Sequence, residues 1–344
     1  MSNGSDQDML DLLVVGAGPT GIAIGARARQ TGLNVLLVDR GPLAAALVEF
    51  PVYMEFFTTR DLMEIAGVPL SIPHDKPNRR EALAYYRSVA ARFEIPVALH
   101  EEVVALERAE DGFEVSSRRR GSPDDTVRRA RSVVLAQGYF HRPRALGVSG
   151  ESLSWVHSRY REPYGHFGER VAIIGGGNSA VEAALELWRN HVRVTVVHRR
   201  PRIKATVKYW LEPDFENRVA EGSIEALFGA TVRSFAEEPE GRRIELESDS
   251  GRSSLPVDAA YVLIGYEPDT ALARECGVAF DPETLVPAFD PHTCESNVPG
   301  LFLAGTVQVG RDIGKLFIEN SRVHADRIVA EVASRASEGL SGPN

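Results

Sequence analysis

The sequence contains few cysteines, and the two that it has are not close together. Only Cys276 and Cys294 occur among 344 residues, so a disulfide-stabilised scaffold is excluded and no CxxC motif is present for dithiol chemistry. Basic residues are outnumbered by acidic ones: 39 Lys and Arg against 48 Asp and Glu give a formal net charge of −9, and no basic stretch alternates with aromatic residues. This balance argues against a nucleic-acid partner, because phosphate backbones are bound by clustered lysines and arginines.

The sequence also lacks the long apolar run of roughly 18 to 20 residues that a membrane span requires. It starts with the polar stretch MSNGSDQDMLD, which is neither a secretory signal nor an Arg-rich transit peptide. We therefore expect a cytoplasmic protein without a membrane partner. Nine histidines are present, but no HxxxH or HExxH pair has a third ligand nearby, so no metal site is expected.

Two segments of the chain have the pattern of a strand, a glycine-rich turn, a helix and a second strand. They are LDLLVVGAGPTGIAIGARARQTGLNVLLVDR and RVAIIGGGNSAVEAALELWRNHVRVTVVHRR. Each is followed by a stretch typical of a small antiparallel meander. We predict an α/β protein with two Rossmann-type dinucleotide-binding domains. Each is expected to have three layers, two of strands and one of helices (ββα), and a chain of this length accommodates both domains.

The final segment, VPGLFLAGTVQVGRDIGKLFIENSRVHADRIVAEVASR, is predicted to be a strand, a glycine turn and a long helix that return to the first domain. The second domain is therefore interpreted as an insertion. The predicted boundaries are 1–162 and 281–344 for the first domain and 163–280 for the second.

The first glycine turn has the GxGxxG spacing that lets a backbone approach a pyrophosphate at the start of a helix. Asp39 ends the next strand about 20 residues on, where an acid binds a ribose diol. The predicted FAD-binding residues of this domain are Gly16, Gly18, Pro19, Thr20, Gly21, Asp39, Arg40, Gly138, Gly305, Thr306 and Gln308. The last three follow the returning strand, where a helix start would face the flavin ring.

The second turn reads GxGxxA, and its following strand ends in cations instead of an acid. Cations at this position favour the 2′-phosphate of NADPH. The predicted NADPH-binding residues are Gly175, Gly177, Asn178, Ser179, Ala180, His198, Arg199 and Arg200. Lys204 and Lys208 could extend this phosphate clamp, although a solvated helix start is the preferred interpretation. Hydride transfer between two dinucleotide sites requires one of them to hold a flavin, which assigns FAD to the first domain.

The sequence resembles the thioredoxin-reductase-like flavoproteins and, more closely, the bacillithiol-disulfide reductase (YpdA-like) family. The stretches that carry the resemblance are GAGPTG, FPVYMEFFTTRDLMEIAGVPL, EALAYYR, LAQGYFHRP, IIGGGNSAVEAALEL, IKATVKYWLEPDFENRV and LFIENSRVHADRIVAE, which run from about residue 11 to 331. The resemblance implies the two-domain FAD and NADPH architecture and the NADPH-dependent reduction of a low-molecular-weight disulfide.

The chain departs from that family at Thr20, where the family has a cysteine that is thought to exchange with the disulfide. A threonine cannot do so, which leaves direct reduction by the flavin or a different acceptor. Thr306 stands where the wider superfamily has the acid of AGD, a departure that the narrower group shares. Both cysteines are expected to lie far from the flavin, Cys294 being the more exposed.

The sequence predicts an FAD-dependent NADPH oxidoreductase that acts on a small-molecule acceptor and could form homo-oligomers. A flavin-dependent monooxygenase and a non-catalytic redox sensor that binds both nucleotides remain alternatives. His324 and Arg322 form either a wall of the flavin or acceptor pocket or a packing network, and the sequence does not decide between the two.

Overall fold

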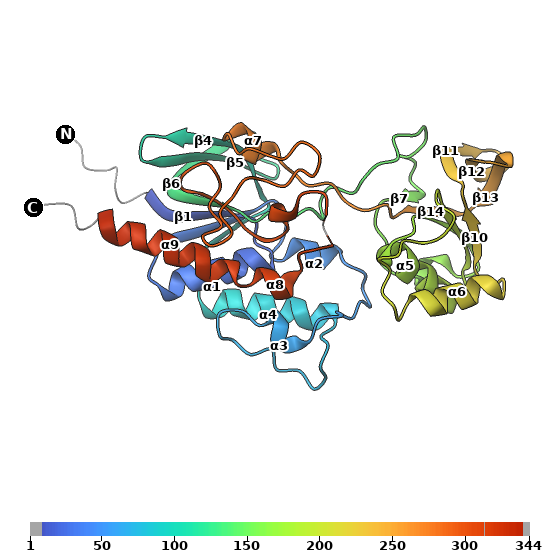
Figure 1. Ribbon diagram of the computed structural model, residues 1–344, viewed down its shortest axis with the longest axis horizontal. Coiled ribbons are helices and arrows are strands. Elements are labelled where there is room, and N and C mark those ends of the chain that lie inside the picture. Colours follow the sequence, from blue (N-terminus) through green and yellow to red (C-terminus); the bar gives the residue numbers. More distant parts are fainter. Residues whose placement is uncertain (1–8, 313, 340–344) are drawn as a thin grey trace, which may run out of the picture. The chain divides into compact units, whose positions relative to one another are not determined.

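The computed structural model describes residues 9–312 and 314–339 and divides into two compact units (Figure 1). Unit 1 comprises Met1–Glu49, Tyr53–Arg142 and Glu267–Asn344, and unit 2 comprises Phe50–Val52 and Pro143–Tyr266. Unit 1 is thus formed by three segments of the chain and unit 2 by two.

The limits of the two units differ from the predicted boundaries near 163 and 280. The strand β7 (Val156–His157) belongs to unit 2 because it pairs with β14 (Ala259–Val262). The helix α7 (Ala271–Glu275) belongs to unit 1, where it packs on β4. Both segments are too short to show a periodic pattern, so only their tertiary pairing reveals where they belong.

Unit 1 is built on a sheet with strand order β3-β2-β1-β6-β5-β4, in which β15 also pairs with β6. The first three of these and β15 run parallel to β6, whereas β4, β5 and β6 form an antiparallel meander. The strands are β1 (Met9–Val15), β2 (Val35–Asp39), β3 (Val97–Leu99), β4 (Glu101–Ala109), β5 (Gly112–Arg119), β6 (Asp125–Leu135) and β15 (Leu301–Leu303).

Helices lie on one face of the parallel part of this sheet, and strands of the meander pack on the other face of that part. The helix α1 packs against α4 and α9, while Leu13 and Val15 of β1 share a buried cluster with Phe113 and Val115 of the meander. This alternation is the period-2 pattern of a strand buried on both faces. The helices are α1 (Pro19–Gln30), α2 (Ala45–Glu49), α3 (Arg60–Met63), α4 (Arg79–Arg92), α7, α8 (Ile318–Ser321) and α9 (His324–Gly339), and the 3₁₀ turn η2 spans Gly305–Val309.

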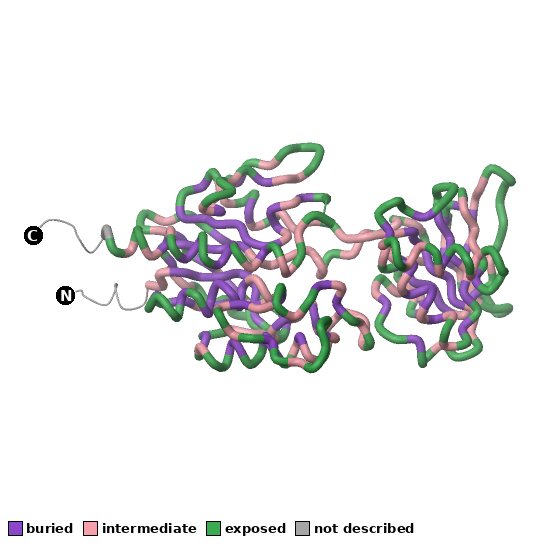
Figure 2. Tube along the Cα trace, turned by 60° about the horizontal axis from the view of Figure 1, so that its bottom comes forward, coloured by how far each residue is buried: buried purple, intermediate pink, exposed green. Residues whose placement is uncertain are grey.

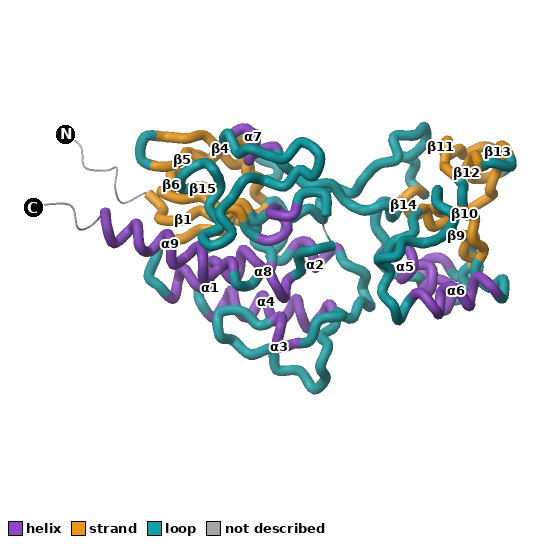
Figure 3. The backbone as a smooth tube through the Cα atoms, in the orientation of Figure 1, coloured by secondary structure: helices purple, strands orange, loops and turns teal. Residues whose placement is uncertain are grey.

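Unit 2 has a fully parallel sheet in the order β10-β9-β8-β14-β7, and a separate antiparallel sheet β11-β12-β13 (Figure 3). Helices α5 and α6 pack on one face of the parallel sheet, and the antiparallel sheet packs on the other. The elements are η1 (Tyr164–His166), β8 (Arg170–Ile174), α5 (Asn178–Arg189), β9 (Arg193–His198), α6 (Glu212–Ala220), β10 (Glu225–Phe228), β11 (Thr231–Glu238), β12 (Gly241–Ser248) and β13 (Gly251–Val257).

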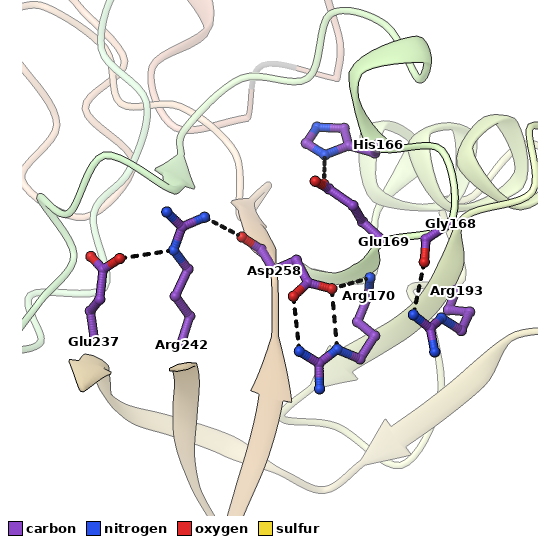
Figure 4. Close-up of polar contacts among 8 residues, drawn as sticks. All are labelled: His166, Gly168, Glu169, Arg170, Arg193, Glu237, Arg242 and Asp258. Carbon is purple, nitrogen blue, oxygen red and sulfur yellow. Dashed lines mark hydrogen bonds and ion pairs between the residues drawn. The ribbon is translucent and has the colours of Figure 1, made fainter. Parts of the chain in front are cut away.

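Both units therefore have the predicted three-layer ββα arrangement. The buried residues gather in the interior of each unit, around its parallel strands (Figure 2). In unit 2 the amino ends of the strands are closed by polar contacts (Figure 4). Asp258 accepts hydrogen bonds from the backbone and the guanidinium of Arg170, and His166 contacts Glu169 at 2.7 Å. The opposite edge, where the strands end, is left for the glycine turns.

Candidate functional site

The first glycine turn lies against the carboxyl end of β6. Gly16 has a φ of +113°, and a Cβ there would lie 2.5 Å from the carbonyl oxygen of Ala136. Only glycine fits such a close approach. Gly21, one turn into α1, is packed in the same way against the carbonyl of Gly16. The turn is thereby held at the edge where parallel strands end, which is the usual ligand site of this kind of sheet.

The start of α1 is open. Gly18 occupies the N-cap position with φ −78° and ψ −178°, and no side chain caps the helix. A Cβ at Gly18 would have no other heavy atom within 4 Å. Pro19 follows at the first helical position, where its missing N–H costs nothing. The free N–H groups of this helix start and the space in front of them fit the pyrophosphate of a dinucleotide.

Asp39 braces this turn from the end of β2. Its two carboxylate oxygens accept hydrogen bonds from the backbone N–H of Ala17 at 2.8 Å and of Gly41 at 2.7 Å. Each oxygen keeps a second lone pair, which is available to accept a hydrogen bond from a ribose hydroxyl. Binding of a ribose diol by Asp39 stays a prediction. Arg40 points to the exposed carboxylate of Glu102, 3.5 Å away.

The other predicted residues of unit 1 gather at the far end of the same turn. A Cβ at Gly138 would lie 3.6 Å from Oγ1 of Thr306, and one at Gly305 would lie 3.1 Å from Oγ1 of Thr20. Gln308 is buried and donates to the carbonyl of Leu303 at 2.7 Å. The predicted strand, glycine turn and long helix are present as β15, η2 and α9, but the helix start expected directly after Gly305 is a five-residue 3₁₀ turn, and the long helix starts at His324.

Three residues outside the predicted FAD-binding set belong to this cluster. Oε1 of Gln137, next to the Gly16 contact, is buried without a hydrogen-bond partner. Ser321 of α8 has its Oγ 3.1 Å from Oγ1 of Thr20, and Nδ1 of His324 accepts the N–H of Gly305 at 3.1 Å. The LAQGYF and IENSRVH stretches were signals for these residues, but their side chains meet the first turn only through the tertiary fold.

The second turn, in unit 2, repeats this geometry. Gly175 has a φ of +152°, and its Cβ would lie 2.4 Å from the carbonyl of Leu263 and 3.1 Å from Cβ of Ala180. Gly177 is the uncapped N-cap of α5. Asn178, beside the predicted Ser179, also contacts the loop after β9: its Oδ1 accepts the N–H of Lys208 at 2.9 Å. A second uncapped helix start, again at the carboxyl edge of a parallel sheet, thus fits a second pyrophosphate.

A group of cations lies beside this second helix start. The pKa of Lys204 is lowered by burial and by the nearby Arg144, Arg200 and Arg199. The ammonium of Lys204 lies 3.9 Å from the Cβ position of Gly177. Cations crowded in this way are stabilised by a bound anion. Arg144 is outside the predicted set, and the position of Lys204 favours the phosphate clamp over the solvated helix start.

His198 lies beneath the same turn. It is buried, its ring atoms lie 2.8 Å from the Cβ position of Gly176, and its Nε2 has no hydrogen-bond partner. Burial and the charges of Lys204, Arg199 and Arg200 lower its pKa. The predicted role of His198 as a phosphate cation is therefore disfavoured by its surroundings, whereas the exposed Arg199 and Arg200 keep that role as a prediction. Lys208 instead pairs with Glu182 at 2.6 Å.

Cys276 lies at the end of α7 and packs against the core of unit 1, whereas Cys294 does not lie where the sequence predicted. Cys294 is fully buried, not exposed, and its carbonyl accepts the N–H of Leu303. The chain reverses direction between Cys294 and Leu303, which brings Cys294 close to the Gly305 turn. Burial raises the pKa of its thiol, and burial and Glu275 raise the pKa of Cys276 to about 11. Both thiols therefore stay protonated near neutral pH and are poor nucleophiles.

In residues 9–312 and 314–339, no group of three or more His, Cys, Asp or Glu side chains could hold a metal ion. No helix within these ranges combines the length and apolar character of a membrane span.

Comparison with known proteins agrees with this geometry. The family model of pyridine nucleotide-disulphide oxidoreductases matches residues 13–305. The chain is 33% identical to the bacilliredoxin reductase Bdr of Bacillus subtilis over 329 residues, which cover 94% of this chain and 97% of that protein.

Two solved structures are similar over nearly the whole chain. The bacillithiol disulfide reductase Bdr (YpdA) from Bacillus cereus superposes with a TM-score of 0.91 at 32% identity, covering 95% of this chain and 99% of that one. The Staphylococcus aureus protein of the same name gives 0.87 at 27% identity with the same coverage.

Proposed function

Because the chain belongs to the pyridine nucleotide-disulphide oxidoreductase family, we propose that it passes electrons from NADPH through FAD directly to a low-molecular-weight disulfide. That it is an FAD-containing, NADPH-dependent oxidoreductase follows from the family and its relatives. The acceptor, the direct route and the residues that bind each cofactor are the proposal.

The two helix starts differ in charge, which supports the assignment of one cofactor to each. The glycine turn of unit 1 is braced by the carboxylate of Asp39, which would repel a 2′-phosphate, so we assign FAD to this unit. The glycine turn of unit 2 has four cations nearby, Arg144, Arg199, Arg200 and Lys204. They would attract a 2′-phosphate, so we assign NADPH to this unit. The bound FAD supplies a two-electron store that accepts a hydride and reduces the acceptor.

The observation that carries the proposed direct route is the surroundings of Thr20. The Thr20 hydroxyl lies beside Gly305 and hydrogen-bonds to Ser321, so the position expected for the family cysteine holds a hydroxyl that cannot take part in disulfide exchange. Cys276 donates its S–H to the carbonyl of Leu106, away from the turn, and Cys294 is buried and protonated. The overall reaction balances without a protein thiol: NADPH, one proton and the disulfide give NADP⁺ and two thiols.

The test is to reduce the enzyme anaerobically with one equivalent of NADPH and to mix it with a panel of oxidants, following flavin absorbance. We expect about one FAD per chain and the fastest reoxidation by a small disulfide, with bacillithiol disulfide among the weaker ones. Reoxidation that is fastest with oxygen, through a lasting adduct, would instead indicate a monooxygenase. Reduced enzyme that no oxidant turns over would indicate a sensor.

The variant Thr20→Cys separates the direct route from a thiol route. The turn depends on its glycines, so FAD binding should be largely retained, whereas turnover of bacillithiol disulfide should increase. Robust wild-type turnover of that disulfide that disappears in Cys294→Ser would contradict the direct route.

A further inference from the structure

The turn that follows β15 is fixed by a histidine from another element. His324 is the first residue of α9 and is only 4% exposed. Its Nδ1 lies 3.1 Å from the backbone nitrogen of Gly305, and both groups are buried. A backbone N–H can only donate, so Nδ1 must be the acceptor and the ring must carry its proton on Nε2.

Two hydroxyl groups, those of Thr20 and Ser321, also lie beside the same turn. Gly305 has a φ of +66°, and its Cβ position lies 3.1 Å from Oγ1 of Thr20 on α1. That hydroxyl lies 3.1 Å from Oγ of Ser321, which also contacts the carbonyl of Ile318 on α8. The turn is therefore confined between α9 and the pair formed by α1 and α8.

The contact also decides which amides of the turn can reach a ligand. The first N–H groups of a helical turn have no partner inside the turn. Because His324 takes the N–H of Gly305, that amide is not available to the flavin. The amides that follow it, those of Thr306 and Val307, are the ones that the turn can present.

We propose that His324 is a positioning residue for FAD, whose neutral imidazole holds the Gly305 peptide so that the amides of η2 face the flavin. This inference rests on the proposed placement of FAD in unit 1. It assigns to His324 a role that does not require contact with either substrate. A packing role alone would depend on the size of the ring and not on an acceptor at the position of Nδ1.

The experiment compares His324→Asn with His324→Gln. The amide oxygen of asparagine can occupy the position of Nδ1, whereas that of glutamine lies one bond further out, near the position of Nε2. His324→Leu removes the acceptor altogether, and His292→Leu, at an exposed position in the same unit, is the control. Each variant is assayed for its FAD dissociation constant, its flavin absorption spectrum and its flavin midpoint potential.

We expect Asn to bind FAD within about threefold of the wild type, and Gln and Leu to bind about tenfold more weakly with altered spectra and potentials, as one lost hydrogen bond predicts. Equal affinity and spectra for Asn and Gln would overturn the proposal, and so would an unchanged His324→Leu enzyme. If Leu does not fold, judged by circular dichroism, the comparison of Asn with Gln still decides. Wild-type protein that binds no FAD would instead refute the proposed function.

Discussion

His198 and His324 are both buried beside a glycine turn, and both are held neutral. For His198 the causes are burial and the cations Lys204, Arg199 and Arg200. For His324 they are burial and Arg327 of its own helix, which lower its pKa to about 4. Each histidine therefore serves its turn as an uncharged ring, and protonation of either would place a buried charge next to a backbone turn.

The pKa of His324 predicts a loss of stability in acid. Its folded value of about 4 lies below the unfolded value of 6.5, so the unfolded chain binds more protons between these limits. Stability is unaffected above pH 6.5 and falls as the pH drops from 6.5 to 4, by about 3 kcal/mol at most. Arg327 is the charged group that acts on the ring, while Gly305, Thr20 and Ser321 on the neighbouring elements are neutral.

Denaturant unfolding of the wild type and of His324→Asn at several pH values between 4 and 7 measures this effect. The wild-type curve should fall more steeply than that of the variant, because asparagine does not titrate. Parallel curves would show that His324 is not the group responsible.

Arg200 is predicted to determine the preference for NADPH over NADH. A charge-assisted hydrogen bond to the 2′-phosphate contributes roughly 1.5 to 3 kcal/mol, so Arg200→Ala or Arg199→Ala should raise the KM for NADPH by about 10- to 100-fold. The KM for NADH should change little. Steady-state kinetics with both coenzymes measure this, with Arg252→Ala on β13 as a control for loss of an exposed arginine. Equal use of NADPH and NADH by the wild type would contradict the assignment.

Among the helices and strands, the two 12-residue helices that follow the glycine turns matter most for cofactor binding. α1 and α5 both begin at an uncapped glycine with extended backbone, and both start where a parallel strand has just ended. A helix end without a capping side chain lowers stability unless a ligand satisfies its N–H groups. These helix starts are thus the parts of each unit that cofactor binding should stabilise most.

A side chain at Gly18 should prevent FAD binding without unfolding unit 1. The Cβ position is open, so Gly18→Val fits the unliganded turn but occupies the space for the pyrophosphate. Gly16→Ala should also lose FAD, but by distorting the turn against Ala136. FAD content and the apo melting temperature measure the difference, with Gly165→Val, also at an open position, as the control. Normal FAD content in Gly18→Val would show that the pyrophosphate lies elsewhere.

At the scale of the whole molecule, each unit has one glycine turn that could bind a dinucleotide, and the thiols of Cys276 and Cys294 both have raised pKa values. The double variant Cys276→Ser and Cys294→Ser should therefore retain NADPH-driven flavin reduction at close to the wild-type rate. Its stability should fall, because a hydroxyl replaces a fully buried thiol at Cys294. Stopped-flow absorbance under anaerobic conditions measures the rate. A loss of flavin reduction in protein that still binds FAD would mean that a thiol takes part.

The sequence by itself determined the two nucleotide units, their order and the glycine turns. Strand periodicity and the GxGxxG and GxGxxA spacings are local, because they follow from the geometry of one strand, one turn and one helix. The contrast between Asp39 and the Arg199–Arg200 pair could also be predicted, since Asp39 ends the strand after the first turn and the two arginines directly follow the strand after the second. The ββα layering followed from the same patterns.

Only the tertiary structure decided which distant residues meet at those turns. The meeting of His324 and Ser321 with Gly305 and Thr20 depends on how α8 and α9 pack back onto α1, across more than 300 residues for the Thr20–Ser321 pair. Cys294 was misplaced for the same reason: counting residues along an extended chain put it far from the turn, whereas a backbone reversal returns it to Leu303. Long-range packing depends on the whole core, and no local spacing encodes it.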